Sequence, residues 1–215
     1  MRYLNKIVFI NSAAIRYSEV QLDGNIHLIG TQGVGKSTIL RAILFFYNAD
    51  TQRLGIPVEK KSYQDYYFPY ADSSIIYEVA REDGWFTVLS YKTMNRICYR
   101  FIASPYRPDL FIDEEGAPYP SDRIRSVLDK NGIKYSGAIS TYEEYRNILY
   151  GNSDNKRDYS CYSLMESGSY QNIIRTIQNV LLNSRLEADY IKPVSYTHLT
   201  LPTNREDHHL LERGG

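Results

Sequence analysis

An eight-residue segment, GTQGVGKS, has the residue types and the spacing of a phosphate-binding loop. It runs from Gly30 to Ser37 and satisfies the pattern GxxxxGK followed by Ser or Thr in full. Glycines allow a backbone in which successive amide groups point at one anion, and a helix that begins directly after the loop adds the positive end of its dipole. The sequence therefore predicts a site that binds the phosphate groups of a nucleoside triphosphate.

Single residues of this loop have separate expected roles. We expect Lys36 to reach the β- and γ-phosphate oxygens, Ser37 to ligate a bridging Mg²⁺ ion, and Thr38 to hydrogen-bond the α-phosphate. All of these roles concern binding. The complete set of predicted cofactor-binding residues is Gly30, Thr31, Gln32, Gly33, Val34, Gly35, Lys36, Ser37 and Thr38.

Two other segments could complete such a site. LFIDEEG, Leu110–Gly116, can be interpreted as a short Walker B element, with Asp113 for magnesium and Glu114 as general base, or as the DxxG element of a GTPase. NKRD, Asn155–Asp158, matches the guanine-reading pattern NKxD. Neither follows a long apolar run of the kind that buried strands have. We favour a solvent-facing turn and a loop, and a self-contained GTPase or kinase stays the second hypothesis.

Composition restricts the remaining classes of function. Lysine plus arginine (25) balances aspartate plus glutamate (25), so contact with DNA would need a local basic patch. Cys98 and Cys161 are far apart, which argues against a zinc site or a disulfide framework. No signal peptide and no apolar run of about 18 residues is present, so we expect a cytoplasmic protein without a membrane partner. The 21 tyrosines are expected to be mostly core residues.

The loop needs a strand before it and a helix after it. Apolar runs predict strands over Leu4–Ile10, Ser18–Leu22 and Asn25–Ile29, the last two joined at an Asp-Gly turn. From Ser37 a helix follows directly. Its expected buried face consists of Ile39, Leu40, Ile43, Leu44 and Tyr47.

Downstream of that helix, an irregular connection with an aromatic anchor is expected over residues 50–70. An antiparallel meander and three helices should follow. The strands are Ser74–Ala80, Trp85–Tyr91 and Ile97–Ala103, and the helices are Ser121–Lys130, Thr141–Leu149 and an amphipathic one from Tyr170 to about Lys192.

The last stretch of the sequence differs from the rest. VSYTHLTLPTNRE, within Val194–Gly215, resembles the translated read-through of a synthetic sequencing adapter, and a natural disordered tail is the alternative. We therefore predict one domain over residues 1–192 and a non-native or disordered tail over 193–215, and we expect the natural reading frame to continue beyond Lys192.

The opening of the chain, KIVFINSAAIRYSEVQLDGNIHLIGTQGVGKSTILRAILFFY, resembles the N-terminal lobe of an SMC-like ATPase (structural maintenance of chromosomes), with Gln32 where asparagine is usual. TYEEYRNILYG and RTIQNVLLNSRLEADYIK resemble the large condensin-like ATPases of bacterial chromosome maintenance and of Wadjet-type plasmid defence. The resemblance implies an α/β fold: a partial ABC-type head with an antiparallel meander, and a helix that leads toward a coiled coil.

This resemblance also implies cofactors, partners and missing parts. The cofactors would be ATP and Mg²⁺. Two heads of a homodimer would sandwich the nucleotides, and DNA and accessory subunits would be further partners of a nucleoid-associated protein. The signature motif, Walker B aspartate and catalytic glutamate would lie beyond the coil, so we expect no catalytic residue in this chain and little hydrolysis by it alone.

Some residues have no assigned role. Gln64 and Gln171 are candidates for the glutamine that such a lobe carries, with surface glutamines favoured for both. Arg53, Lys60 and Lys61 could contact phosphate or DNA, with a solvated loop favoured. A third hypothesis is a non-catalytic domain that uses nucleotide only to order a partner interface.

Overall fold

The computed structural model describes residues 2–23, 26, 28–29, 31, 33, 35–54, 56, 59–94, 96–151 and 159–164. These residues all belong to one unit, Met1–Leu182. The predicted helix from Tyr170, the NKRD segment and the tail lie outside the described residues. The predicted domain boundary near residue 192 therefore stays a prediction.

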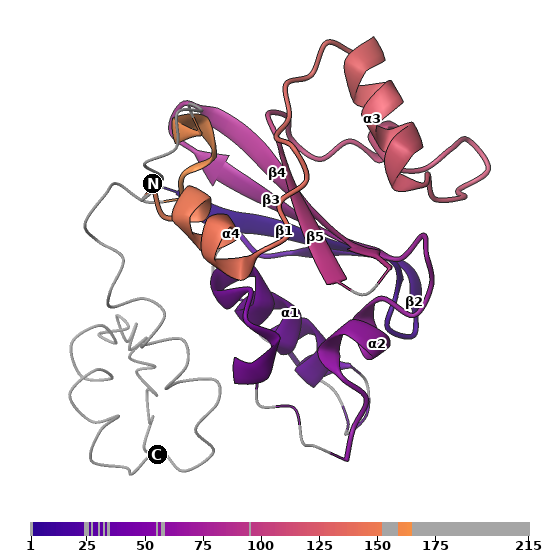
Figure 1. Cartoon of the computed structure of the whole chain (residues 1–215). Helices are drawn as coiled ribbons and strands as arrows, with labels where there is room; N and C mark the ends of the chain where they lie inside the picture. The colour runs from indigo at the N-terminus through magenta and orange to yellow at the C-terminus, as the bar shows by residue number, and fades with distance from the viewer. Residues whose placement is uncertain are drawn as a thin grey trace, which may run out of the picture. The chain divides into compact units, whose positions relative to one another are not determined.

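In the described part of the chain, five strands form one antiparallel sheet in the order β2-β1-β3-β4-β5. The strands are β1 (Tyr3–Ser12), β2 (Ile15–Gln21), β3 (Ser74–Arg81), β4 (Gly84–Thr93) and β5 (Arg96–Ile102). Strands β3, β4 and β5 form the predicted meander, and β1 pairs with both β2 and β3 (Figure 1). The α/β class with an antiparallel sheet is confirmed.

The predicted strand over Asn25–Ile29 is wrong for its described residues. Ile26, Leu28 and Ile29 lie outside the sheet, and Ile29 is 90% exposed. The strand before the Asp-Gly turn, β2, lies at the edge of the sheet and pairs with β1, and none of these three residues pairs with its other side. An apolar run becomes a strand only where a neighbour supplies the hydrogen bonds and the packing.

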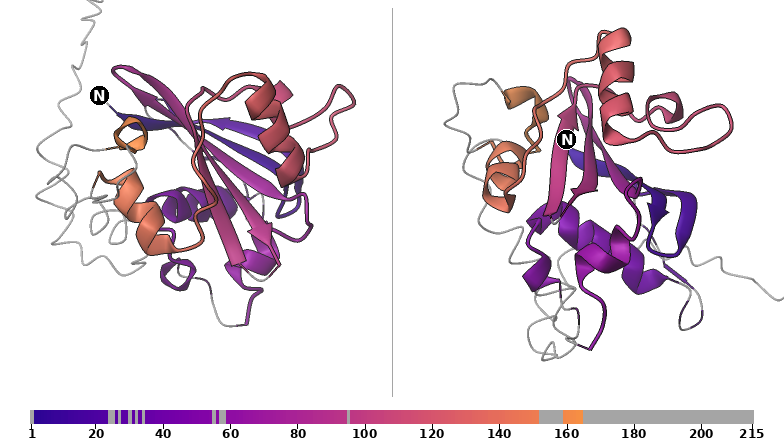
Figure 2. Two further views of the ribbon diagram at one scale, coloured as in Figure 1. Left: turned by 45° about the horizontal axis from the view of Figure 1, so that its top comes forward. Right: turned by 45° about the vertical axis from the view of Figure 1, so that its right-hand side comes forward.

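Helices cover both faces of the sheet. α1 (Lys36–Asn48) and α4 (Tyr142–Leu149) contribute to the cluster on one face, and α3 (Ser121–Lys130) contributes to the cluster on the other (Figures 1 and 2). In β1 the side chains alternate between these clusters, with Ile7 on one face and Val8 on the other. Burial on both faces explains why β1 and β3 are nearly continuous apolar runs.

The short helices are η1 (Thr51–Arg53), α2 (Tyr63–Tyr67), η2 (Pro108–Leu110) and η3 (Ser160–Tyr162). The predicted helices over 121–130 and 141–149 are confirmed as α3 and α4, and the Thr141 hydroxyl accepts a hydrogen bond from the amide of Glu144 at 3.3 Å. The expected aromatic anchor between residues 50 and 70 is α2, whose Tyr63 and Tyr67 are buried.

The predicted buried face of α1 needs correction. The buried residues are Ala42, Leu44, Phe45, Phe46 and Asn48, whereas Ile39, Ile43 and Tyr47 pack only partly against the core. The prediction was therefore correct for Leu44, and it left out Phe45 and Phe46, which belong to the same core cluster.

Tyrosine hydroxyls surround α1. Five tyrosine hydroxyls donate hydrogen bonds to backbone carbonyls of α1 or of its C-cap residue. Two of the acceptors, Phe46 and Tyr47, lie in the last turn of the helix, where carbonyls lack partners within the helix. The pairs are Tyr67 to Thr38 at 2.8 Å, Tyr77 to Ala42 at 3.1 Å, Tyr145 to Phe46 at 2.6 Å, Tyr150 to Tyr47 at 2.6 Å and Tyr99 to Ala49 at 3.4 Å. These five tyrosines are therefore structural, as expected.

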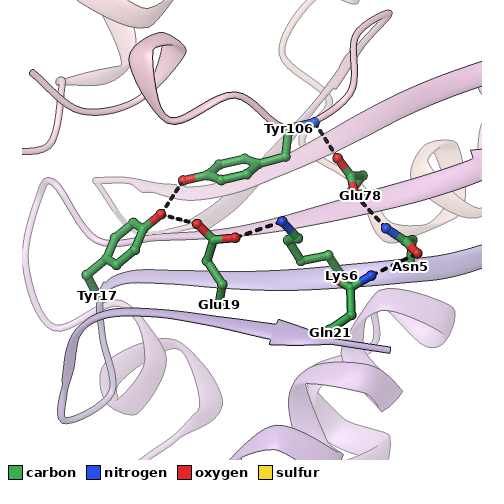
Figure 3. Close-up of polar contacts among 7 residues, drawn as sticks. All are labelled: Asn5, Lys6, Tyr17, Glu19, Gln21, Glu78 and Tyr106. Atoms are coloured by element: carbon green, nitrogen blue, oxygen red, sulfur yellow. Dashed lines mark hydrogen bonds and ion pairs between the residues drawn. The ribbon is translucent and has the colours of Figure 1, made fainter. Parts of the chain in front are cut away.

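A polar network joins the neighbouring strands β2, β1 and β3 and includes Tyr106 (Figure 3). Lys6 donates to Glu19 at 2.7 Å, and the Tyr17 hydroxyl bonds to both Glu19 and Tyr106. Burial pushes the pKa of the Glu19 carboxyl up, but the hydrogen bonds from Lys6 and Tyr17 outweigh burial, so its pKa lies below the ordinary value. A buried carboxylate, Glu78, accepts from the Tyr106 amide at 2.6 Å in the same network.

No helix among the described residues is long and apolar enough to span a bilayer.

Candidate nucleotide-phosphate site

The phosphate-binding loop borders a cavity of about 840 Å³. Part of the wall comes from the loop and the start of α1, and part from the segment that leads into α2. The lining residues are Gly33, Gly35, Lys36, Ser37, Thr38, Arg41, Ile56, Lys60, Lys61, Tyr66 and Tyr67. A volume of this size suits one small-molecule ligand.

Two glycines of the loop have backbones that other residues rarely adopt. Gly33 has φ +92° and Gly35 has φ +91°, and a Cβ built on either would meet no atom within 4 Å. Glycine is therefore needed for its conformational freedom and not for lack of space. Left-handed residues within a loop turn amide groups toward a common point, which is the geometry of an anion-binding nest.

Helix α1 begins at this loop, and no capping or acidic side chain of its first turn offsets the positive end of the helix dipole. Its N-cap is Gly35, no side chain caps it, and no acidic residue lies in its first turn. The Gly35 carbonyl accepts from the amides of Thr38 (3.0 Å) and Ile39 (3.1 Å), which closes the first turn. The arrangement favours an anion at the helix N-terminus.

The three residues predicted to contact the triphosphate, Lys36, Ser37 and Thr38, are the first three residues of α1. Lys36 Nζ donates to the carbonyl of Thr31 at 2.7 Å, so in this structure the ammonium group contacts its own loop. Ser37 is exposed, and its hydroxyl could join phosphate oxygens and water in holding Mg²⁺, which needs few protein ligands. Thr38 Oγ1 lies 3.4 Å from the Tyr66 hydroxyl. Gly30, Gln32 and Val34 lie outside the described residues.

The cavity also contains residues that the sequence interpretation missed. Arg41 follows Ser37 by four residues and therefore lies one turn further along α1, a spacing that could have indicated it. Tyr66 and Ile56 come from a separate segment and had no signal of their own. Lys60 and Lys61 were considered for phosphate, with a solvated loop favoured. The structure brings both to the cavity wall.

The cavity is strongly basic. Its lining includes four cationic side chains, those of Lys36, Arg41, Lys60 and Lys61, and none of the described residues that line it is acidic. Burial raises the pKa of the Tyr67 hydroxyl although Arg41 nearby lowers it, so Tyr67 is neutral and serves as a hydrogen-bond donor. The site therefore matches an anionic ligand in charge.

The alternative catalytic segment lies in a turn. Asp113 Oδ1 accepts from the amides of Glu115 (3.1 Å) and Ala117 (2.7 Å), which is the hydrogen bonding of an Asx turn, and neither Asp113 nor Glu114 lines the cavity. The favoured interpretation of LFIDEEG as a solvent-facing turn agrees with this geometry. Gln64 lies on α2 and is not a lining residue, and Gln171 lies outside the described residues.

Other candidates for chemistry are weak within the described part of the chain. Cys98 is buried and Cys161 is exposed, and the two do not form a disulfide. No group of three or more His, Cys, Asp or Glu residues there is arranged to hold a metal ion.

Comparison with known proteins gives a family but no activity. No curated protein matches the chain. Residues 12–183 match the family model described as protein of unknown function (DUF3584). This match is loosely compatible with an SMC-like protein, and it carries no information on ATP binding or on Wadjet-type defence. Because the match spans most of the 215 residues, the chain belongs to the DUF3584 family.

Proposed function

We propose that this chain binds Mg²⁺-ATP through Gly30–Thr38 as the N-terminal half of an SMC-like ATPase head that acts on DNA. The observation that carries the nucleotide part is the cavity itself. The sequence contains a full GxxxxGKS motif. Its two left-handed glycines and the start of α1 line one cavity together with four cationic side chains.

Each part of the loop has a defined task in this proposal. The Gly33 and Gly35 backbones form the nest for the β-phosphate, and Lys36 leaves the Thr31 carbonyl to contact the β- and γ-phosphate oxygens. Ser37 supplies a hydroxyl to Mg²⁺. The loop and helix thereby bind and orient the nucleotide without activating water.

Unpaired apolar surface beside the loop supports the proposal that the head needs a second half. Ile26 and Ile29 lie within the four residues before the loop yet outside the sheet, and they are 41% and 90% exposed. Ile39 and Ile43 on α1 are only partly buried. A distal part of the full-length chain that pairs with this segment would cover these residues and would bring acidic groups, of which the described lining residues include none.

The biological role follows from the SMC-like resemblance and is proposed on that ground alone. Two such heads would close on two ATP molecules, and hydrolysis would reopen them to move or reshape DNA in chromosome maintenance, repair, or plasmid or phage defence.

Sequencing the gene past Lys192 and measuring nucleotide preference test this function. We expect heptad repeats followed by a distal Walker B element, and the joined halves should hydrolyse ATP in preference to GTP. A stop codon shortly after Lys192 would remove the SMC-like proposal. A clear preference for GTP would favour the self-contained GTPase, and a complete protein that binds ATP without turnover would favour the regulatory domain.

A further inference from the structure

The part of the cavity wall that comes from the segment before α2 carries two adjacent lysines. Lys60 and Lys61 are exposed and line the same cavity as Gly33, Gly35 and Lys36. They directly precede Ser62, whose hydroxyl caps α2 by accepting from the Asp65 amide at 3.1 Å. The lysine pair therefore has a fixed position at the start of a capped helix.

Helix α2 is in turn held against the first turn of α1. The Tyr67 hydroxyl donates to the Thr38 carbonyl at 2.8 Å. Tyr63 stacks on Tyr67 with ring centroids 4.1 Å apart and on Phe45 of α1 at 4.4 Å. These contacts fix the position of the lysine-bearing wall relative to the phosphate-binding loop.

The number of cations indicates what this wall recognises. The nest and Lys36 suffice to hold a β-phosphate, yet Lys60 and Lys61 add two more positive charges to a cavity whose described lining residues include no acid. Each extra phosphate on a ligand adds negative charge, and charge-assisted hydrogen bonds to it are among the stronger polar contacts. Two further cations therefore favour the ligand with more phosphates.

The shape of the site favours a nucleotide over DNA. The lysines lie on a cavity of about 840 Å³ that they share with the loop. Such a cavity admits a single nucleotide, whereas a duplex presents its phosphates along an extended surface.

We propose that Lys60 and Lys61 contact the terminal phosphates of the bound nucleotide and make the site prefer a triphosphate to a diphosphate. This inference rests on the proposed nucleotide site and adds a discriminating element to it. Only the three-dimensional structure indicates this role, because residues 60 and 61 are more than 20 positions beyond the loop in the sequence.

Calorimetric titration of Mg²⁺-ATP and Mg²⁺-ADP into the double variant Lys60→Ala/Lys61→Ala tests the inference. We expect ATP to bind about ten-fold more weakly or worse, with a much smaller change for ADP, because the lost contacts involve the last phosphate. The conservative pair Lys60→Arg/Lys61→Arg should keep the preference for ATP. The control pair Lys130→Ala/Lys134→Ala removes two exposed lysines outside the cavity lining and should change neither affinity.

Failure of this inference and failure of the proposed function give different results. If Lys36→Ala weakens ATP binding but the Lys60/Lys61 double variant binds both nucleotides like the wild type, the site stands and the inference is overturned. Equal losses for ATP and ADP also overturn it. If the double variant loses DNA binding while its ATP-to-ADP preference is unchanged, the lysines contact DNA instead. An unaltered ATP affinity in Lys36→Ala contradicts the proposed function itself.

Discussion

At Gly35 the requirement for glycine comes from the backbone alone. Its φ of +91° is unfavourable for an L-residue, while a Cβ there would touch no atom within 4 Å. The cost of substitution is therefore strain in the loop that presents the amide groups, and it should appear in ligand binding more than in folding.

We predict that Gly35→Ala weakens Mg²⁺-ATP binding by about ten-fold or more, because roughly 1–2 kcal/mol of left-handed backbone strain is relieved only by distorting the nest. Gly132→Ala is the matched control, since Gly132 also has positive φ (+65°) and open space but does not line the cavity. Both variants should lose a little thermal stability, and only the first should lose affinity. Equal affinities in the two variants would contradict the nest.

The loop could be proposed as a site from the sequence because the whole motif is contiguous, and its binding roles stay predictions. Lys36, Ser37 and Thr38 needed only their spacing and a helix after them. The other wall could not be predicted in the same way, because Lys60 and Tyr66 approach the loop through the packing of α2 on α1. No local sequence pattern indicates this packing.

At the scale of elements, tyrosine hydroxyls stabilise α1. This helix has no basic residue in its last turn, and its terminal carbonyls receive hydrogen bonds from Tyr145 and Tyr150 instead. Tyr67 makes the corresponding contact near the loop. The helix that presents the candidate site is thus fixed along its whole length.

We predict that Tyr145→Phe lowers the free energy of unfolding by roughly 1–3 kcal/mol, because the fully buried hydroxyl donates at 2.6 Å to the Phe46 carbonyl and its loss leaves that acceptor unpaired. Chemical denaturation measures the change. Tyr142→Phe, at a 41% exposed position on the same helix, should have an effect near zero. Similar stabilities for both variants would mean that the buried hydroxyl contributes nothing net.

The strands and helices were largely predictable at this scale, and their packing was less so. The strand predictions over 74–80, 85–91 and 97–103 located β3, β4 and β5, and the helix prediction over 141–149 located α4. The predicted buried face of α1 was correct for Leu44 but left out Phe45 and Phe46, which are also buried in the core. The segment over 25–29 was wrong because strand formation depends on a neighbour that local sequence does not specify.

For the molecule as a whole, buried tyrosines link folding to alkaline pH. Burial raises the pKa of the Tyr63, Tyr77 and Tyr145 hydroxyls well above 10.0. In the unfolded chain these groups would ionise near the ordinary value. Because the folded-state pKa is the higher one, their contribution to stability is complete below about pH 10 and is lost as the pH rises above it.

We therefore predict a steep loss of stability above about pH 10, with the buried tyrosines ionising together as the protein unfolds. Denaturant titrations over a pH series and tyrosinate absorbance measure the two effects. The Tyr145→Phe variant should show a shallower pH dependence, since one buried hydroxyl is gone. Independent ionisation of all tyrosines near their ordinary pKa without unfolding would be inconsistent with this core.

The α/β class and the antiparallel sheet were within reach of the sequence, and the family match to residues 12–183 agrees loosely with the SMC-like resemblance. The proposed ATPase head stays a proposal, and the exposed Ile29 beside the loop has no partner strand among the described residues.

Titration of Mg²⁺-ATP into the wild-type chain and into Lys36→Ala tests the central claim most directly. The account predicts saturable one-to-one binding to the wild type and at least about ten-fold weaker binding to the variant, with Lys134→Ala equal to the wild type and all three equally folded. No binding to the folded wild-type chain, or equal affinity for wild type and Lys36→Ala, would contradict it.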